Sequence, residues 1–301
     1  MSRVLEPLRA KIQTTLSGHP AGDPPWVTAL EFGTDPGYFG PGSAAWAVHG
    51  DVPTLVAGIR ALLTQALHPG AMAGVHDHSR YREDPFGRLA GTIRWIFTVT
   101  YGSREDAARA SAWVLRLHEK VRGVYPGGNG TAVPYSANDP ELLRWVHLAF
   151  TDAFLGAHRV WGKPIPGGED AYVRDWAIAG ELMGVDGPPV TAAELHDQLR
   201  SYLGVLRHDD RVEDVVRFLR RPPLAPALRS SYPLLFNAAV ASLPDDLREL
   251  LGLAKPNRAV IPATGVVLRA TGRLLGLPPG AEKAAIRRIE RLGGATASPA
   301  A

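Results

Sequence analysis

The 301-residue chain contains no cysteine. It can therefore form no disulfide, no zinc–thiolate or iron–sulfur centre and no cysteine nucleophile, and no thiolate can ligate a haem iron in it. Long apolar runs are also missing. The best candidate, residues 92–101, spans about half of the roughly 20 residues that a membrane helix needs, and it carries Arg94. The N-terminal residues lack the apolar stretch of a signal peptide. We expect a cytoplasmic protein without a membrane span.

Excess charge of one sign is absent as well. The formal net charge is only +3, and the arginines are scattered among acidic residues rather than gathered in a stripe. This distribution argues against a nucleic-acid partner. With 45% hydrophobic and 21% charged residues, the composition is that of a globular protein with a sizeable core. The sequence leaves open whether the chain forms a homodimer.

Several catalytic signatures are missing. The chain has no Gly-x-Ser-x-Gly nucleophile turn, no phosphate-binding loop and no dinucleotide fingerprint after a strand. It has no His-Glu-x-x-His motif and no facing Glu-x-x-His helices of the di-iron type. The sequence thus disfavours hydrolases, nucleotide-binding enzymes and di-iron enzymes.

The hydrophobic pattern that is present has a helical period almost throughout, which predicts an all-α fold. We divide the chain into an N-terminal helix with a Gly/Pro-rich lead-in (1–44), a helical core (45–222), C-terminal helices that pack on it (223–293) and a disordered tail (294–301). Helices are predicted over residues 3–16, 54–67, 71–76, 85–100, 103–122, 140–160, 169–185, 191–206, 210–220, 231–242, 244–253, 258–275 and 280–293, and a Gly/Pro loop over 124–137.

His118 lies on the apolar face of the predicted helix over residues 103–122. That face also holds Ala107, Ala110, Val114, Leu117 and Val121. A histidine there is either a core side chain hydrogen-bonded to a carbonyl or carboxylate, or a metal or haem ligand on a rigid helix. In a chain without cysteine, imidazole is the natural ligand of a haem iron.

Other histidines offer weaker signals. His147 lies on the apolar face of the 140–160 helix, where it is a second iron ligand, a pocket group or a core residue bonded to backbone. His68, His76 and His78 surround a Pro-Gly turn. The spacing of the His76-x-His78 pair is compatible with a mononuclear metal site, but loop histidines are more often surface or capping groups.

Arg88 and Thr92 are four residues apart on the predicted 85–100 helix, so they stack on one face. An arginine and a threonine along an apolar stripe are unusual for packing alone. Arg88 either holds an anionic group or extends its guanidinium to water.

Several runs resemble the MpaB-type oxygenase family, which includes the catalytic domain of rubber oxygenase (latex-clearing protein). They are residues 61–79, 84–92 and 101–107, the segment 114–123 around His118, and the run 135–147 that ends in Trp-Val-His. The likeness covers roughly residues 45–200, with several motifs in matching order. It implies a single globin-like all-α domain that binds haem b through a histidine and performs oxygen-dependent chemistry.

The resemblance implies roles for particular residues. Arg88, Thr92 and His118 occupy the places of an arginine, a threonine and the axial histidine in rubber oxygenase. His118 would ligate the iron, and Arg88 would anchor a propionate or a pocket network. Thr92, His147 and Thr151 would donate hydrogen bonds to the oxidant. We also assign His68, within the matched run 61–79, to the cofactor pocket.

The chain departs from rubber oxygenase on the side of the iron opposite the axial histidine. Gly91 stands where that enzyme has a lysine that can cap the iron, and its glutamate base has no clear equivalent. We therefore expect a haem b-dependent oxygenase or oxidase that uses O2 or peroxide on a small hydrophobic or metabolite substrate. A non-catalytic haem sensor or carrier, and a helical scaffold without cofactor, are the alternatives.

Overall fold

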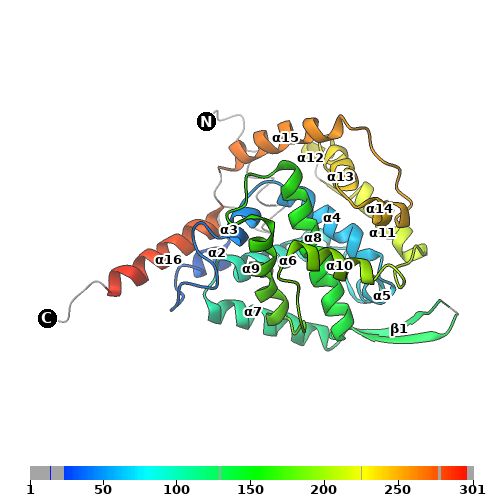
Figure 1. The fold of residues 1–301 in the computed structure, drawn as a ribbon, viewed down its shortest axis with the longest axis horizontal. Helices are drawn as coiled ribbons and strands as arrows, with labels where there is room; N and C mark the ends of the chain where they lie inside the picture. Colours follow the sequence, from blue (N-terminus) through cyan, green and yellow to red (C-terminus); the bar gives the residue numbers. More distant parts are fainter. Residues whose placement is uncertain (1–13, 15–23, 129, 225, 277–278, 297–301) are drawn as a thin grey trace.

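The computed structural model describes residue 14 and residues 24–128, 130–224, 226–276 and 279–296. In these residues the chain is an assembly of α-helices with one small β-hairpin, as Figure 1 shows, and the all-α prediction is confirmed. The helix predicted over residues 3–16 lies outside the described residues except for Thr14.

The elements follow the predicted order closely in the middle of the chain. In sequence they are α2 (Pro25–Ala29), α3 (Ala44–His49), α4 (Thr54–Ala66), α5 (Pro69–His78), α6 (Pro85–Tyr101), α7 (Arg104–His118), β1 (Arg122–Pro126), β2 (Ala132–Ser136), α8 (Pro140–Trp161), α9 (Gly168–Leu182), α10 (Ala192–Ser201), α11 (Asp210–Arg220), α12 (Pro226–Arg229), α13 (Tyr232–Ala241), α14 (Asp245–Leu250), α15 (Val260–Leu275) and α16 (Gly280–Thr296).

Side-chain caps explain where two of these helices begin. The Asp84 carboxylate accepts a hydrogen bond from the Gly87 amide at 2.9 Å and starts α6. The Ser103 hydroxyl accepts one from the Asp106 amide at 3.1 Å and starts α7. Both are the expected use of a short polar side chain at a helix start, since the first amides of a helix have no partner within it.

The core is organised around α4 and α8, which pack along most of their lengths. Two polar links fix this antiparallel pair: the Trp145 indole donates to the Gln65 carbonyl at 3.1 Å, and the Arg60 guanidinium meets the Asp152 carboxylate at 2.7 Å. Arg60 is buried, and a Cβ at position 156 would overlap its guanidinium, so only glycine fits there. α8 is thus held in a fixed position for the side chains that it presents elsewhere.

The prediction of a loop over residues 124–137 is wrong for most of its length. β1 and β2 pair antiparallel, with Val124 opposite Pro134 and Tyr125 opposite Val133, and the hairpin extends from the helical body in Figure 1. The Gly127-Gly128-x-Gly130 segment is the connection between the strands, and Gly130 has a φ of +79° there. β1 is mostly exposed without a regular alternation, and the alternation of β2 covers only five residues, which is too short a pattern to distinguish a strand from a loop.

Other boundaries also differ. The short helices α2, α3 and α12 were not predicted, and α7 ends at His118 rather than near residue 122 because the chain turns there into β1. α16 continues to Thr296, so residues 294–296, predicted to belong to a disordered tail, are helical, and residues 297–301 lie outside the described part. Short helices have too few turns to display a period, which is why they escape prediction.

The C-terminal helices close one side of the molecule. α13 packs on α4 and α15, while α16 packs on α2 and α6. The buried Arg288 of α16 donates to the carbonyls of Leu30, Pro36 and Tyr101, the last at 2.8 Å. This arginine therefore joins the N-terminal segment, the end of α6 and the C-terminal helix.

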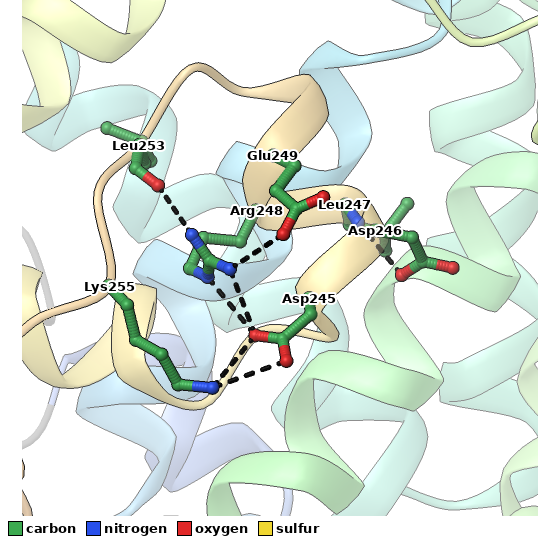
Figure 2. A network of polar contacts seen from close by, with 7 residues as sticks. All are labelled: Asp245, Asp246, Leu247, Arg248, Glu249, Leu253 and Lys255. Carbon is green, nitrogen blue, oxygen red and sulfur yellow. Dashed lines mark hydrogen bonds and ion pairs between the residues drawn. The ribbon is translucent and has the colours of Figure 1, made fainter.

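A second arginine stabilises the end of α14 (Figure 2). Arg248 donates to the Leu253 carbonyl at 2.8 Å and to the Asp245 carboxylate at 3.0 Å, and Lys255 donates to the same carboxylate at 3.1 Å. The network satisfies a carbonyl just beyond the helix. Its partners all lie within residues 245–255, so it has a local structural role.

Among the described residues, no single helix is long and apolar enough to cross a membrane, although α15 and α16, at 53° to each other, meet the length and composition in combination.

Candidate functional site

The connection between α6 and α7 brings Arg88 and His118 together. Only Gly102 and Ser103 separate the two helices, which pack along each other, so the start of α6 lies beside the end of α7. Arg88 is in the first turn of α6, and His118 is the last residue of α7. The guanidinium is close enough to the imidazole to contribute to lowering its pKa.

The Arg88 guanidinium is only partly compensated. Its Nε atom donates to the Ser79 hydroxyl at 2.8 Å, whereas its two Nη atoms have no hydrogen-bond partner among the described residues. Burial lowers the pKa of Arg88 from its ordinary value, and the residue remains partly exposed to solvent. A partly buried guanidinium with free donors forms charge-assisted hydrogen bonds to an anion. Arg88 is thus suited to bind an anionic group.

The His118 imidazole is half-buried, and polar atoms in and beside the ring lack hydrogen-bond partners. Its Nδ1 atom is buried without a hydrogen-bond partner, and so is the Oδ1 atom of Asn138. The Asn138 amide is itself anchored, because Nδ2 donates to the Leu115 carbonyl at 3.0 Å. Burial lowers the pKa of His118, Asn138 raises it in part, and Arg88 lowers it further. The ring is therefore neutral at neutral pH, as a metal ligand must be.

Thr92 lies one turn beyond Arg88 on α6. Its side chain is half-buried, and its hydroxyl donates to the Arg88 carbonyl at 3.2 Å. Thr92 thus contacts Arg88, and Arg88 lies near His118, whereas the roles predicted for these residues stay predictions. While it donates to the helix backbone, the Thr92 hydroxyl can only accept a hydrogen bond from another group.

His147 and Thr151 come from α8 and face α9. The His147 ring lies against Gly180, where a Cβ would come within 3.0 Å of the imidazole, so glycine makes room for it. The Nε2 atom of His147 is buried and unpartnered, and burial lowers its pKa to about 4. Thr151 is fully buried and donates to the His147 carbonyl at 2.7 Å. His147 is therefore a neutral imidazole with an unpartnered ring nitrogen, whereas the Thr151 hydroxyl already donates its proton to the His147 carbonyl.

α9 connects the two groups of residues, because it packs on both α7 and α8. The ring of Trp95 from α6 meets that of Trp176 from α9, with centroids 6.0 Å apart. Apolar side chains near the candidate residues pack against the core but are only partly buried; they are Trp95, Val146, Phe150, Ile178 and Leu182. These side chains therefore keep some apolar surface outside the core.

His68 is placed elsewhere. It is the N-cap of α5, where its Nδ1 atom accepts hydrogen bonds from the amides of Gly70 at 3.2 Å and Ala71 at 3.5 Å. Its ring lies near Trp145 and Tyr202, with centroids 5.9 Å and 6.0 Å away, and it has no contact with Arg88 or His118 among the interactions of the described residues. In the structure His68 thus acts as a helix cap, which is one of the roles that the sequence left open for the histidines around the Pro-Gly turn.

His76 and His78 also separate. His76 pairs with Asp77 at 3.0 Å, and the His78 ring contacts the Arg122 carbonyl at 3.0 Å. Among the described residues, no three histidine, aspartate or glutamate side chains gather as a metal site of protein ligands would require. This finding has no bearing on a haem, whose porphyrin supplies four of the ligands itself.

Sequence reasoning missed three residues near or beneath the site. Ser79 lies between α5 and α6 and Asn138 between β2 and α8, and only their contacts with Arg88 and His118 single them out; Asn138 was considered only as a helix cap. His49 is a satisfied core histidine, bonded to the Thr100 hydroxyl at 2.7 Å and the Tyr172 hydroxyl at 3.0 Å. No spacing pattern marked it.

The depressed histidine pKa values predict sensitivity to acid. Burial lowers the pKa of His49 to about 3 and that of His68 to about 4, both well below the unfolded value of 6.5. Between pH 6.5 and 4 the unfolded chain binds more protons than the folded one, so stability falls as the pH falls through this window. Each residue accounts for about 3 kcal/mol when the window is fully crossed.

Thermal unfolding measured from pH 7.5 to 4.5 should therefore show a steady drop in Tm below pH 6.5. The variant His68→Asn retains an acceptor for the α5 cap but cannot titrate, so its Tm should fall less steeply. A Tm that stays level over this range would contradict the placement of these rings.

The protein is thus an all-α domain in which a neutral histidine lies beside an arginine that has no anionic partner among the described residues. The sequence model described as "ER-bound oxygenase mpaB/B'/Rubber oxygenase, catalytic domain" matches residues 46–280, so the chain belongs to that family of oxygenase catalytic domains. The matched span covers the predicted core and most of the predicted C-terminal helices. No curated protein and no solved structure matches the chain.

Proposed function

We propose that this protein is a haem b-dependent oxygenase that uses O2 or peroxide on a small hydrophobic or metabolite substrate. The observation that carries the proposal is the pairing of His118 and Arg88 at the adjoining ends of α7 and α6. One is a neutral imidazole and the other is an arginine that has no counter-ion among the described residues. A haem b offers an iron to the first and a propionate carboxylate to the second.

The unsatisfied atoms of the site fit this cofactor. His118 would ligate the iron through Nε2, which places the proton on Nδ1. That proton has a natural acceptor in the buried Oδ1 atom of Asn138, which has no other partner. Histidine ligands usually donate their second ring nitrogen in this way, which fixes the ring orientation and raises its basicity. Asn138 is therefore the positioning residue for His118.

When bound, the cofactor would supply an iron able to activate the oxidant, and the chain's part is to bind, orient and exclude water. Arg88, held by Ser79, would fix the propionate edge. The half-buried Trp95, Val146 and Phe150 would cover apolar surface of the ring or the substrate. His147 would be the residue that contacts the oxidant, a role supported by its unpartnered Nε2 atom, since the hydroxyls of Thr92 and Thr151 donate to backbone.

The free Nε2 atom of His147 also supports a second candidate, a haem carrier or sensor in which this ring occupies the other axial position. Oxygen uptake distinguishes the two candidates. We expect the purified, haem-loaded protein to consume O2 in the presence of a reductant and small alkenes. A six-coordinate spectrum in both redox states without oxygen uptake would favour the carrier, and a protein that stays colourless after haem addition would leave only a helical scaffold.

Replacing Asn138 tests how His118 is held. Asn138→Ala removes the acceptor for Nδ1, and loss of such a partner typically weakens metal binding about 10–100-fold. Asn138→Asp keeps an acceptor and adds charge, so it should retain the cofactor and lower the iron reduction potential. Haem titration and potentiometry measure the two effects. Equal haem affinity and potential in all three proteins would show that Asn138 does not orient the ligand.

A further inference from the structure

A cavity of about 500 Å³ lies between the β-hairpin, the start of α8 and the end of α10. Its wall includes Tyr125, Tyr135, Tyr202 and His68, together with the carboxylates of Asp139 and Glu141. None of Arg88, Thr92, His118 and His147 lines it. The cavity is therefore distinct from the site proposed to hold the haem.

The wall is aromatic on several sides. The rings of Tyr125 and Tyr135 have centroids 6.4 Å apart and are tilted by 44°, while His68 and Tyr202 meet edge to face at 6.0 Å. The Tyr135 hydroxyl donates to Asp77 at 3.4 Å, away from the residues of the cavity wall, which leaves its ring as the lining group. Aromatic rings from three separate elements can surround a cation, because each ring face carries partial negative charge.

The charge of the wall is of one sign. Asp139 accepts from the Ser136 amide at 2.6 Å, and Glu141 accepts from the Tyr202 hydroxyl at 2.9 Å. Each carboxylate has further acceptor capacity. No lysine or arginine lines the cavity. Arg144, which is near Tyr202, donates to the Asp186 carbonyl at 2.6 Å and is not part of the wall.

His68 adds no positive charge. Two backbone amides donate to its Nδ1 atom, so the ring proton is on Nε2. Burial lowers the pKa of the ring to about 4, and the residue is only 7% exposed. At neutral pH the cavity thus contains two carboxylates, a neutral imidazole and three tyrosine rings.

We propose that this cavity binds an organic cation, a molecule with an ammonium group on a flat apolar body. The ammonium would donate to the carboxylates of Glu141 and Asp139 and lie against the face of Tyr125 or Tyr202, while the apolar body fills the remaining space. The same wall disfavours anions, because they would meet two carboxylates. The proposal is independent of haem binding and can be tested in protein with or without the cofactor.

Isothermal titration with three probes of similar shape tests the chemistry. We expect 2-phenylethylamine to bind, 2-phenylethanol to bind at least about tenfold more weakly, and phenylacetate not to bind. A tenfold difference corresponds to about 1.4 kcal/mol, near the lower end of the contribution of a hydrogen bond to a charged group. Equal binding of the amine and the alcohol, tight binding of phenylacetate, or no binding of the amine at millimolar concentration would each overturn the proposal.

Three variants locate the binding. Glu141 is exposed, so Glu141→Gln should fold normally, weaken the amine about tenfold and leave the alcohol unchanged. Tyr125→Leu should weaken the amine about fivefold while Tyr125→Phe does not, because only the first removes the ring. Glu181→Gln, at an exposed carboxylate of α9 that is not part of the wall, is the matched control. Amine binding that is insensitive to Glu141→Gln and Tyr125→Leu would place the ligand elsewhere and overturn the assignment.

Discussion

The variant His118→Ala should purify without haem under conditions in which the parent protein binds it. In the proposed function, His118 would be the one residue of this chain that ligates the iron on its side of the porphyrin, and alanine offers no donor atom there. His118 ends α7 and is half-buried, so its removal should leave the fold intact. We expect the Soret band to be lost or strongly shifted, and haem affinity to fall by at least about 100-fold.

The exposed His196 of α10 supplies the matched control. His196→Ala removes an imidazole of the same chemistry from a site outside the region of Arg88, and it should leave the Soret band unchanged. Circular dichroism on both variants separates loss of cofactor from loss of fold. Unchanged haem stoichiometry and spectrum in His118→Ala would remove this residue from the site.

The variant Asp152→Asn should lower the free energy of unfolding by about 3 kcal/mol, since it leaves a buried arginine charge without its counter-ion. The Arg60 side chain is 3% exposed and meets the Asp152 carboxylate at 2.7 Å, between α4 and α8. Burial lowers the pKa of Arg60, and Asp152 is the group that opposes this effect. Urea denaturation measures the loss.

An exposed ion pair gives the comparison. Arg159 and Glu169 are 2.6 Å apart, but their side chains are 57% and 40% exposed. Glu169→Gln removes the carboxylate charge as Asp152→Asn does, and solvent screening should limit its cost to less than about 1 kcal/mol. If the two variants lost equal stability, the Arg60–Asp152 pair would not hold α8 in place as we describe.

The arrangement of Arg88, Thr92 and His118 was largely predictable, and the reason is local. Capping residues fix where α6 and α7 begin, and a two-residue connection makes the helices antiparallel. Residues near the outer ends of such a pair must come together. The family was recognised from motifs within residues 61–147. These residues lie inside the span that the family model matches.

Contacts made by residues that lie outside the helices were not predictable. Ser79 supports Arg88 from nine residues earlier, and Asn138 approaches His118 from the far side of a hairpin. A serine or asparagine in a loop has no periodic neighbours, so the sequence gives no sign of its partner. The hairpin itself was interpreted as a loop, which hid both Asn138 and the tyrosine-lined cavity.

His68 has a contact that its sequence context did not specify. It lies in a run that resembles the family, and its cofactor role stays a prediction. In the structure its ring caps α5 and lines the tyrosine-lined cavity. Matching sequence order does not specify which side of a helix bundle a side chain occupies.

The most direct measurement is haem titration of the His118→Gly variant with and without added imidazole. Glycine leaves a space that free imidazole can enter and use to ligate the iron. If His118 is the axial ligand, the variant alone should bind haem weakly, and millimolar imidazole should restore a spectrum close to that of the parent protein. Full haem binding by His118→Gly without imidazole, with a spectrum that imidazole does not alter, would contradict the account.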